Sequence, residues 1–223
     1  MQAISRPVYS SQPFIHPQLG RVVERHLAAP SRRPLASYNR QAFSALQTLQ
    51  SQHLRPLVLD SFCGTGYSTA LLAERHPQHL VVGIDKSAHR LNKHITASCD
   101  NYLLLRAECE AIWQLVLAAQ WPVGFHYLFY PNPWPKPAHF KRRIHGDAAF
   151  PYLVQLGGKV ELRSNWQSYV EEFGLAMGIA GINGTVSQCP DNEPQHSLFE
   201  HKYRASGHSL WRYRNYPNKY SPL

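Results

Sequence analysis

Acidic residues are scarce in this chain. Its 223 residues include 14 Asp and Glu against 23 Lys and Arg, so the formal net charge at pH 7 is +9. Charged residues of both signs make up only 17% of the chain, whereas 43% of it is apolar. This composition excludes an intrinsically disordered tail, because the apolar surface is large enough to offset the conformational entropy lost on folding.

Cysteines and long apolar runs are also few. The four cysteines form no C-x-x-C pair and have no regular spacing, which is typical of reduced thiols in a cytoplasmic protein. The longest apolar runs, such as residues 80–84, are far shorter than the roughly 20 residues that a membrane span needs. The first residues lack the pattern of a secretory leader. We therefore expect a cytoplasmic protein without membrane association.

Motifs of metal sites and of serine hydrolases are absent from the sequence. The thirteen histidines include no H-x-x-x-H and no His/Cys pair at the spacing of a zinc site. One close pair, His76 and His79, has no second pair to complete a site. No serine lies in a G-x-S-x-G turn. These absences predict neither a bound metal nor a hydrolase.

The positive charge is concentrated in three segments. Residues 1–55 contain seven Arg and one Glu, residues 136–143 contain four basic residues, and residues 201–223 contain five basic residues and no acid. The rest of the chain is net acidic. Because charge that serves solubility alone would be dispersed, this clustering indicates a polyanionic partner.

The alternation of apolar runs predicts one α/β domain. Runs of strand type alternate with helix-favouring stretches, which implies right-handed crossovers and a doubly wound, mainly parallel sheet. A final pair of runs, joined by Ala205-Ser206-Gly207, is expected to add a C-terminal antiparallel hairpin and bring the sheet to seven strands. The expected strands cover residues 57–59, 80–84, 102–105, 125–130, 159–162, 197–204 and 209–216, and the expected helices lie near 38–52, 67–76, 87–98, 108–119 and 165–177.

The N-terminal segment is expected to be a separate basic arm. Five prolines within the first 35 residues predict irregular structure there. We therefore assign residues 1–37 to a basic arm and residues 38–223 to a single domain.

The turn after the first expected strand suits a nucleoside ligand. Gly64 and Gly66 let the backbone approach a ligand closely, and the following helix offers free N–H groups at its N-terminus. The second strand ends in Asp85, which is placed to accept the hydroxyls of a ribose. The carboxylate of Asp60 suits the amino group or sulfonium of S-adenosylmethionine better than a pyrophosphate. An ordinary tight strand–helix turn is the alternative interpretation.

A proline-rich loop follows the fourth expected strand, where ligands bind in doubly wound sheets. Residues 131–137 read Pro-Asn-Pro-Trp-Pro-Lys-Pro, and each proline fixes its own φ, so the loop is expected to be rigid. Rigidity helps if Asn132 holds a nucleobase near a donor methyl. The basic residues in and after the loop are candidates for phosphate contacts, with a solvated turn as the alternative: Lys136, His139, Lys141, Arg142 and Arg143.

Aromatic and basic residues alternate near the C-terminus. In an RNA-binding surface, the rings of Trp211 and Tyr213 would stack on bases while Arg212 and Arg214 neutralise phosphates. The same alternation fits an edge strand with its aromatic rings inward and its arginines outward. In either case the two arginines are candidates for RNA contact.

Taken together, these motifs resemble those of the tRNA (guanine-N7)-methyltransferase family. The resemblance rests on the turn from Asp60 to Gly66, on Asp85, on the proline–tryptophan loop with its basic residues, and on residues 197–200. It covers about residues 55–216. It implies a class I, Rossmann-like methyltransferase fold, S-adenosylmethionine as the donor, and methyl transfer to N7 of a guanine in tRNA or another structured RNA.

The resemblance also implies roles for individual residues. Asn132 would position the base and Trp134 would shape its pocket, with Lys136 as the third residue of the acceptor site. Glu108 would lie near the donor adenine, and Ser197 and Glu200 would close the donor pocket. The donor-binding residues would be Asp60, Cys63, Gly64, Gly66, Asp85, Glu108, Ser197 and Glu200.

The chain departs from the family pattern around the acceptor. The family usually has Asp at Asn132, Thr-Asp at Ser164-Asn165, and Thr at Ser197. Asn132-Pro133-Trp134 is also similar to the Asn-Pro-Pro-aromatic loop of methyltransferases that act on exocyclic amines. Two alternatives therefore stay open: a methyltransferase for another acceptor, such as a base amine or a small molecule, and an RNA-binding relative without turnover.

The expected reaction needs little acid–base catalysis from the protein. Guanine N7 carries a lone pair and no proton at neutral pH, so direct in-line transfer needs no general base. The protein must instead align the reacting atoms. Since the N7 edge of A-form RNA lies in a groove too narrow for side chains, the target guanine must lie in a loop or junction, or be turned out of its stack. A monomer and a homodimer both fit the sequence.

Overall fold

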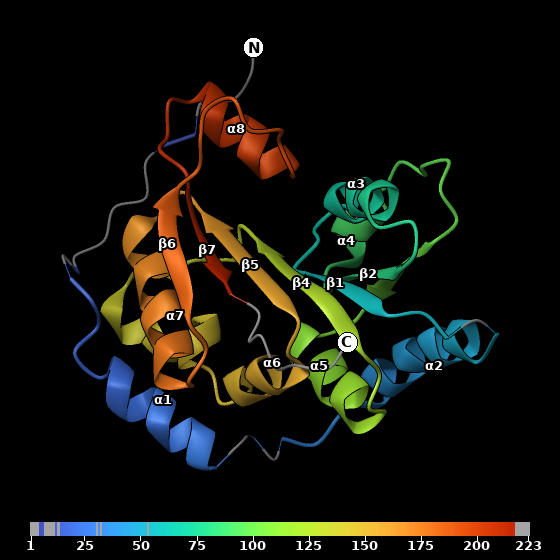
Figure 1. Cartoon of the computed structure of the whole chain (residues 1–223), viewed down its shortest axis with the longest axis horizontal. Helices are drawn as coiled ribbons and strands as arrows, with labels where there is room; N and C mark the ends of the chain where they lie inside the picture. Colours follow the sequence, from blue (N-terminus) through green and yellow to red (C-terminus); the bar gives the residue numbers. More distant parts are fainter. Residues whose placement is uncertain are drawn as a thin grey trace.

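A seven-stranded sheet forms the centre of the protein (Figure 1). The computed structural model describes residues 5–6, 12, 14–29, 31, 33–52 and 54–216. The strand order is β3-β2-β1-β4-β5-β7-β6, and β7 runs antiparallel to both of its neighbours while the other strands are parallel. The strands are β1 (Leu57–Ser61), β2 (Leu80–Asp85), β3 (Tyr102–Arg106), β4 (Val123–Phe129), β5 (Lys159–Ser164), β6 (Gly184–Gln188) and β7 (Trp211–Asn215).

Helices connect the strands and cover the sheet. The α-helices are α1 (Leu19–Ala28), α2 (Ser37–Gln52), α3 (Tyr67–Arg75), α4 (Ala88–Leu91), α5 (Cys109–Ala118), α6 (Phe150–Leu156), α7 (Gln167–Ile179) and α8 (Leu198–Ala205). Two 3₁₀ turns, η1 (Pro137–Arg142) and η2 (Ile144–Gly146), follow the proline-rich loop. Among the described helices, none is long and apolar enough to cross a membrane.

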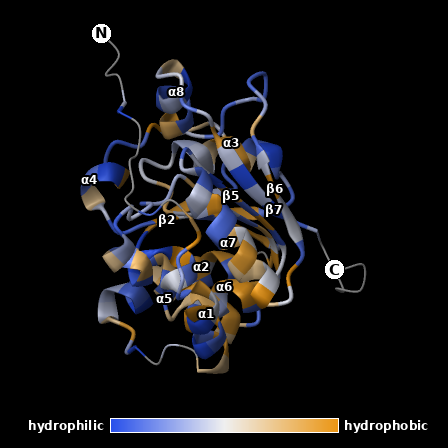
Figure 2. Cartoon of the chain, turned by 90° about the vertical axis from the view of Figure 1, so that its left-hand side faces the viewer, coloured by the Kyte–Doolittle hydropathy of each residue, from blue (hydrophilic) through white to orange (hydrophobic). Residues whose placement is uncertain are grey.

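The two faces of the sheet carry different cores, because successive side chains of a strand point to opposite faces. Leu57 and Leu59 of β1 belong to the larger cluster, which is covered by α1, α2, α5, α6 and α7. Val58 points the other way, into a smaller cluster that includes Leu72 and Ala73 of α3. Figure 2 shows the apolar residues gathered between the sheet and the helices of the larger cluster.

The predicted architecture is confirmed, but the predicted hairpin is wrong. The sheet has seven strands, is mainly parallel and is doubly wound. Residues 197–204 do not form a strand, however, because Ser197 caps a helix: its Oγ accepts a hydrogen bond from the backbone N–H of Glu200 (3.1 Å). The antiparallel partner of β7 is β6, which the sequence analysis missed.

The expectation of irregular structure throughout the first 35 residues is also wrong. Residues 19–28 form α1, which buries Leu19, Val22 and Val23 in the larger core cluster. The helix begins two residues after Pro17, and a proline just before a helix does not disturb its hydrogen bonds. Most of residues 1–13 and all of residues 217–223, which include part of the basic tail, lie outside the described residues.

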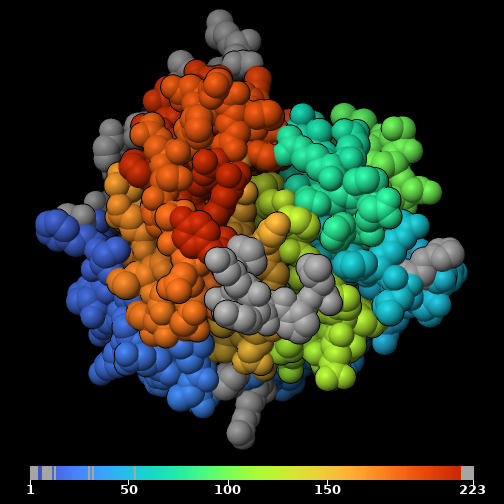
Figure 3. Space-filling view, in the orientation of Figure 1, coloured from blue at the N-terminus to red at the C-terminus, as the bar shows by residue number. Residues whose placement is uncertain are grey.

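The segment before α8 packs against the end of α3. Arg75 closes α3, and its NH1 lies 2.6 Å from Nδ1 of His196. In the space-filling view, the C-terminal part of the chain (orange to red) meets the region of α3 (green) across the upper part of the molecule (Figure 3).

Candidate active site

A cavity of about 800 Å³ opens at the carboxyl ends of the first five strands. It is bounded by Phe62 after β1, Asp85 at the end of β2, Ala107 after β3, Tyr130 after β4 and Asn165 after β5. This is the edge at which doubly wound sheets bind their ligands. The volume lies in the upper part of the range for small-molecule sites, roughly 300–1,000 Å³.

Six of the predicted site residues line this cavity. They come from the ends of the strands and from the proline-rich loop: Asp85, Glu108, Asn132, Trp134, Lys141 and Arg142. The other predicted residues lie outside the cavity lining: Asp60, Cys63, Gly64, Gly66, Lys136, His139, Arg143, Ser197, Glu200, Arg212 and Arg214.

Asp60 lies fully buried in β1, beside the turn that leads to the cavity. Its Oδ2 accepts hydrogen bonds from the hydroxyls of Ser68 and Thr69, both at 2.7 Å. Its Oδ1 is buried and has no hydrogen-bond partner in the described structure. Burial raises the pKa of Asp60 to about 6, against the hydrogen bonds from the two hydroxyls. A buried, half-satisfied carboxylate of this kind suits a cationic ligand group.

The glycines of the turn are required by its conformation. Gly64 and Gly66 have φ of 63° and 77°, in the left-handed region that favours glycine. A Cβ at Gly66 would also lie 2.7 Å from a methyl carbon of Leu104. Cys63 is buried between them and Asp60, and burial raises the pKa of its thiol, so the thiol is unreactive. The described cysteines are all free.

Asp85 ends β2 and bridges the glycine turn and the start of α4. Its Oδ2 accepts the backbone N–H of Gly64 (3.1 Å). Its Oδ1 accepts the backbone N–H of Ser87 (2.8 Å) and NH2 of Arg90 (2.9 Å). The Asp85 carboxylate is 1% exposed, whereas the Arg90 side chain is 44% exposed. The Arg90 guanidinium therefore lies between the Asp85 carboxylate and solvent.

Glu108 is held in place by α2. The carboxylate Oε2 of Glu108 accepts from Nδ2 of Asn39 (3.2 Å), and the backbone N–H of Glu108 donates to Oδ1 of Asn39 (3.0 Å). Asn39 is 1% exposed and also lines the cavity. This reciprocal pair fixes Glu108 at the N-terminus of α5.

The backbone of the proline-rich loop is strained. Tyr130 and Trp134 have φ of 53° and 47°, a left-handed conformation that non-glycine residues rarely adopt. Between them, Oδ1 of Asn132 accepts the backbone N–H of Trp134 (3.3 Å). The Trp134 ring contacts the His139 ring edge-on (5.5 Å) and lies 4.8 Å from the guanidinium of Arg142. Asn132 itself is exposed at the cavity.

Arg143 holds this loop through a fully buried side chain, and its burial contradicts the predicted contact with RNA. Its side chain is fully buried and forms an ion pair with the equally buried Glu172 (2.6 Å). Nε and NH2 of Arg143 both donate to the carbonyl of Trp134 (3.3 and 3.2 Å), and the guanidinium lies 4.8 Å from the ring of Trp166. A side chain with these partners has no surface to offer a phosphate.

Glu172 joins the loop to the N-terminal segment. Its carboxylate accepts hydrogen bonds from Arg143, from Nε2 of His145 (2.9 Å), from Nε2 of Gln12 (2.6 Å) and from the backbone N–H of His16 (2.8 Å). Burial alone would raise the pKa of Glu172, but His145 and Arg143 outweigh it and lower that pKa to about 2. The sequence analysis missed this residue, because nothing near it in the chain marks it as a partner of Arg143.

The other basic residues of the loop are exposed. Lys141 and Arg142 are exposed and line the cavity, whereas Lys136 is exposed outside the lining. His139 is half-buried against Trp134. Lys141 and Arg142 are therefore the loop cations that can meet a phosphate beside a base in the cavity.

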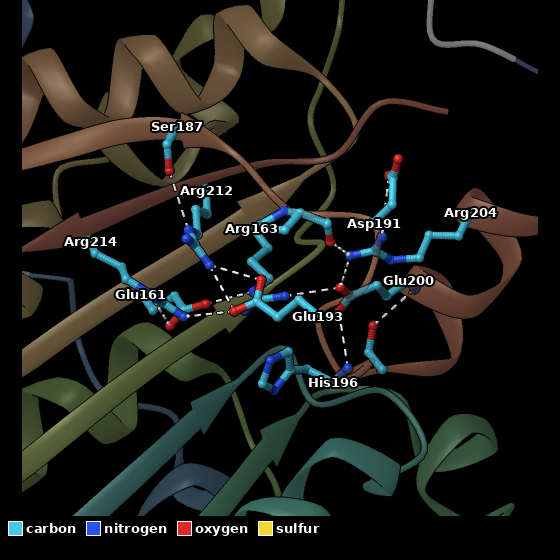
Figure 4. Close-up of polar contacts among 12 residues, drawn as sticks. Glu161, Arg163, Ser187, Asp191, Glu193, His196, Glu200, Arg204, Arg212 and Arg214 are labelled. Carbon is cyan, nitrogen blue, oxygen red and sulfur yellow. Dashed lines mark hydrogen bonds and ion pairs between the residues drawn. The ribbon is translucent and has the colours of Figure 1, made fainter. Parts of the chain in front are cut away.

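Ser197 and Glu200 support α8 and lie outside the cavity lining, and their contact with a donor stays a prediction. Ser197 caps α8, and Glu200 is fully buried. The carboxylate of Glu200 accepts from NH1 of Arg163 (2.9 Å) and from the backbone N–H of His196 (3.0 Å). Figure 4 shows Arg163 at the centre of this network, where it also pairs with Glu161 and Glu193 (2.5 and 3.2 Å).

Arg212 and Arg214 belong to the same network. NH1 of Arg212 donates to both carboxylate oxygens of Glu193 (2.7 and 2.8 Å), and Arg214 pairs with Glu161 (2.7 Å) (Figure 4). The strand interpretation of this segment is confirmed, although β7 is an inner strand and not an edge. The Arg212 side chain is 17% exposed and pairs with Glu193, so little of its guanidinium is open to a phosphate. Arg214 is 44% exposed, and its contact with RNA stays a prediction.

The arrangement can hold a charged nucleoside and a second planar ring in one cavity. Asp85 and Glu108 offer carboxylates on the β2–β3 side, with the buried Asp60 outside the lining, and Asn132 and Trp134 form a polar and aromatic wall on the β4 side. Within the described residues no group of His, Cys, Asp and Glu could hold a metal ion.

Comparison with known proteins places the chain among methyltransferases. A methyltransferase family model, Methyltransf_4, matches residues 54–212. The "tRNA (guanine-N(7)-)-methyltransferase" of Neisseria meningitidis serogroup B is 25% identical over 171 residues, and that of Yersinia pestis (strain Pestoides F) is 28% identical over 169 residues; each match covers 70% of both chains.

Solved structures share the fold at low sequence identity. The 16S rRNA methyltransferase KamB has a TM-score of 0.55 at 14% identity and covers 82% of this chain and 94% of its own. A 16S rRNA (adenine(1408)-N(1))-methyltransferase from Catenulisporales acidiphilia, solved with its cosubstrate S-adenosylmethionine, has a TM-score of 0.53 at 15% identity and covers 81% and 93%. The class I methyltransferase fold expected from the sequence is thereby confirmed.

Proposed function

The chain belongs to the tRNA (guanine-N7)-methyltransferase family and is an S-adenosylmethionine-dependent methyltransferase, and on this premise we propose that it methylates N7 of a guanine in tRNA. One observation carries the proposal. A single cavity is bounded both by Asp85 and Glu108 on the β2–β3 side and by Asn132 and Trp134 on the β4 side, with Lys141 at its solvent edge. A donor and a base can therefore meet in it.

The residues at the ends of β1 and β2 fit the donor. When bound, S-adenosylmethionine supplies a methyl group activated by its positively charged sulfur. The unpartnered Oδ1 of Asp60 is suited to accept the donor's ammonium, because burial leaves that oxygen without another partner. Asp85 is suited to accept ribose hydroxyls once the exposed Arg90 side chain moves aside. Glu108, fixed by Asn39, is suited to accept the amino group of the adenine.

The acceptor needs alignment rather than a base. The lone pair of guanine N7 forms the new bond to the methyl carbon while the bond from that carbon to sulfur breaks, and no proton moves. Asn132 orients the base from the rigid loop, and Trp134 packs beside it. Alignment of two reactants can supply roughly 7–11 kcal/mol of a barrier. Because positive charge develops on the purine, a carboxylate at position 132 would stabilise it more than the amide does.

Substitution of Asn132 tests the acceptor role. We expect Asn132→Ala to lower the single-turnover rate about 10–100-fold at saturating tRNA, since the base loses its orienting group, and Asn132→Asp to raise the rate above wild type. The measurement is rapid-quench transfer of labelled methyl with nucleoside analysis of the product. Calorimetric titration of the donor is the control, because neither variant should change donor affinity. A full rate in Asn132→Ala, or a label found on an exocyclic amine, contradicts the proposal.

Substitution of Lys141 and Arg142 tests the RNA contact. We expect the double variant Lys141→Ala/Arg142→Ala to weaken tRNA binding, and the slope of log K against log salt to become shallower by about 1–2, since two phosphate contacts are lost. Binding is measured by fluorescence anisotropy over a salt series. Lys93→Ala/Lys159→Ala, which removes two exposed lysines outside the cavity and outside the three basic segments, is the matched control. An unchanged slope in the first variant would remove these residues from the RNA interface.

A further inference from the structure

Three aromatic rings of the α8 region stack in series. The ring of Phe199 lies parallel to that of Tyr203, with 6.2 Å between centroids and 24° between planes. The other end of this series continues to His208, whose ring lies 5.3 Å from that of Tyr203 at 19°. We call Phe199, Tyr203 and His208 the ring ladder.

The inner end of the ring ladder is fixed by hydrogen bonds. Nδ1 of His208 accepts from Nδ2 of Asn165 (3.0 Å), and Nε2–H of His208 donates to the carbonyl of Ser5 (3.0 Å). The helix that carries the other two rings is tied to the sheet by the buried pair between Glu200 and Arg163. These contacts connect the ladder to the end of β5 through Asn165 and Arg163.

The outer end of the ring ladder is open to the cavity. Phe199 is 41% exposed, although phenylalanine side chains are usually buried. Phe199 and Tyr203 both line the cavity that Asn132 and Asn165 line. The neighbouring Leu198 is even more exposed, at 52%, but does not line it. Two large apolar side chains of α8 are thus exposed, and the aromatic one lines the candidate site.

We propose that Phe199 is a stacking platform for a purine base of the RNA substrate, the target guanine or its immediate neighbour. An aromatic face that is supported from behind and open in front binds a base turned out of its stack. Lys141 and Arg142 lie on the lining of the same cavity and supply charge for the phosphates of that nucleotide. The inference rests on the proposed function and deepens it, since it assigns a base contact that neither the sequence motifs nor the loop supply.

The donor also contains a purine, its adenine, and both purines have the same stacking chemistry. The candidate donor contacts Asp85 and Glu108 come from the ends of β2 and β3, whereas Phe199 comes from α8, which connects β6 to β7 at the opposite end of the sheet. The position of the ladder therefore favours the acceptor base.

Binding measurements without turnover test the platform. We would measure the affinity of bulk tRNA by fluorescence anisotropy in the presence of S-adenosylhomocysteine, and the affinity of S-adenosylhomocysteine itself by calorimetry. For Phe199→Leu we expect tRNA binding about tenfold weaker, because leucine keeps apolar bulk but has no ring face. Phe199→Trp should bind tRNA within about twofold of wild type. Leu198→Ala, the matched control on the same helix, should also stay within about twofold, and S-adenosylhomocysteine affinity should be unchanged in all three.

Two outcomes overturn the inference. Wild-type tRNA affinity in Phe199→Leu shows that the ring is not a platform, and a tenfold loss of S-adenosylhomocysteine affinity with unchanged tRNA affinity assigns the ring to the donor adenine. Thermal unfolding of each variant identifies any loss that comes from a disturbed α8. If the wild-type protein binds tRNA but transfers no methyl group, the proposed function fails. The tRNA affinities of the Phe199 variants still test the platform in that case.

Discussion

Asp60→Asn is expected to abolish high-affinity donor binding while making the ligand-free protein more stable. Asparagine can still accept hydrogen bonds from Ser68 and Thr69, so the turn should keep its shape. It cannot offer a carboxylate to the donor's ammonium. Removing one partner of a buried, hydrogen-bonded charge pair typically costs about 2–5 kcal/mol, so we expect donor affinity to fall at least about 30-fold by calorimetry.

The gain in stability follows from the raised pKa of Asp60. The pKa of this carboxyl rises from 3.8 in the unfolded chain to about 6 in the folded protein. Protonation of Asp60 at low pH therefore stabilises the folded protein relative to the unfolded chain. That stabilisation is complete below about pH 4 and is lost as the pH rises through about 6. Above that pH the wild-type protein carries a buried charge that costs roughly 3 kcal/mol, which Asp60→Asn removes. The two proteins should therefore unfold at similar temperatures near pH 4 and diverge by pH 7.5.

Donor affinity should follow the same titration. Since the ionised carboxylate is the form that accepts an ammonium, the donor dissociation constant of the wild-type protein should fall between pH 5 and pH 7 and then level off. Asp100→Asn, which changes the same group at an exposed position, is the control for both measurements. Wild-type donor affinity in Asp60→Asn, or a donor affinity without this pH dependence, would contradict the assignment of Asp60.

Arg143→Ala is expected to destabilise the protein strongly rather than to weaken RNA binding selectively. The substitution leaves Glu172 buried without its guanidinium partner and removes both donors from the carbonyl of Trp134. Breaking a buried ion pair by removing one partner costs roughly 3–5 kcal/mol, or about 10 °C in the midpoint of thermal unfolding for a chain of this size. Calorimetric or circular-dichroism unfolding measures the effect.

The adjacent arginine provides the matched control. Arg142→Ala makes the same chemical change at an exposed position and should alter stability by less than about 1 kcal/mol. Arg143→Met/Glu172→Gln should recover part of the lost stability, because it removes both charges together. Arg143→Ala with the stability of Arg142→Ala, and with weaker RNA binding, would restore the contact with phosphate that the basic run suggested.

The sequence predicts the central strands well because their residues are continuously apolar. Leu57–Ser61 and Leu80–Asp85 are buried on both faces, so their composition alone marks them. β6 was missed because Gly184–Gln188 is a largely exposed outer strand with few apolar residues. Residues 197–204 were expected to be a strand because a turn-like segment, Ala205-Ser206-Gly207, separates them from the next run, whereas the hydroxyl of Ser197 caps a helix there.

The sequence likewise predicts some residues of the candidate site and not others. Asp60 and Asp85 could be placed at strand ends from local sequence, because an acid directly follows or ends an apolar run in each. The burial of Arg143 could not, since its partner Glu172 lies 29 residues along the chain on another helix. Nor could the sequence show that Glu200 pairs with Arg163 instead of facing the cavity. Local motifs indicate which groups a site needs, whereas tertiary packing decides which of them are used elsewhere.

Transfer of a tritiated methyl group from S-adenosylmethionine to bulk tRNA, followed by nucleoside analysis of the product, tests the central claim most directly. We predict donor-dependent labelling of tRNA and recovery of the label as 7-methylguanosine. Label in another nucleoside would show that the loop around Asn132 serves a different acceptor. Donor binding without any label in tRNA would contradict the proposed activity.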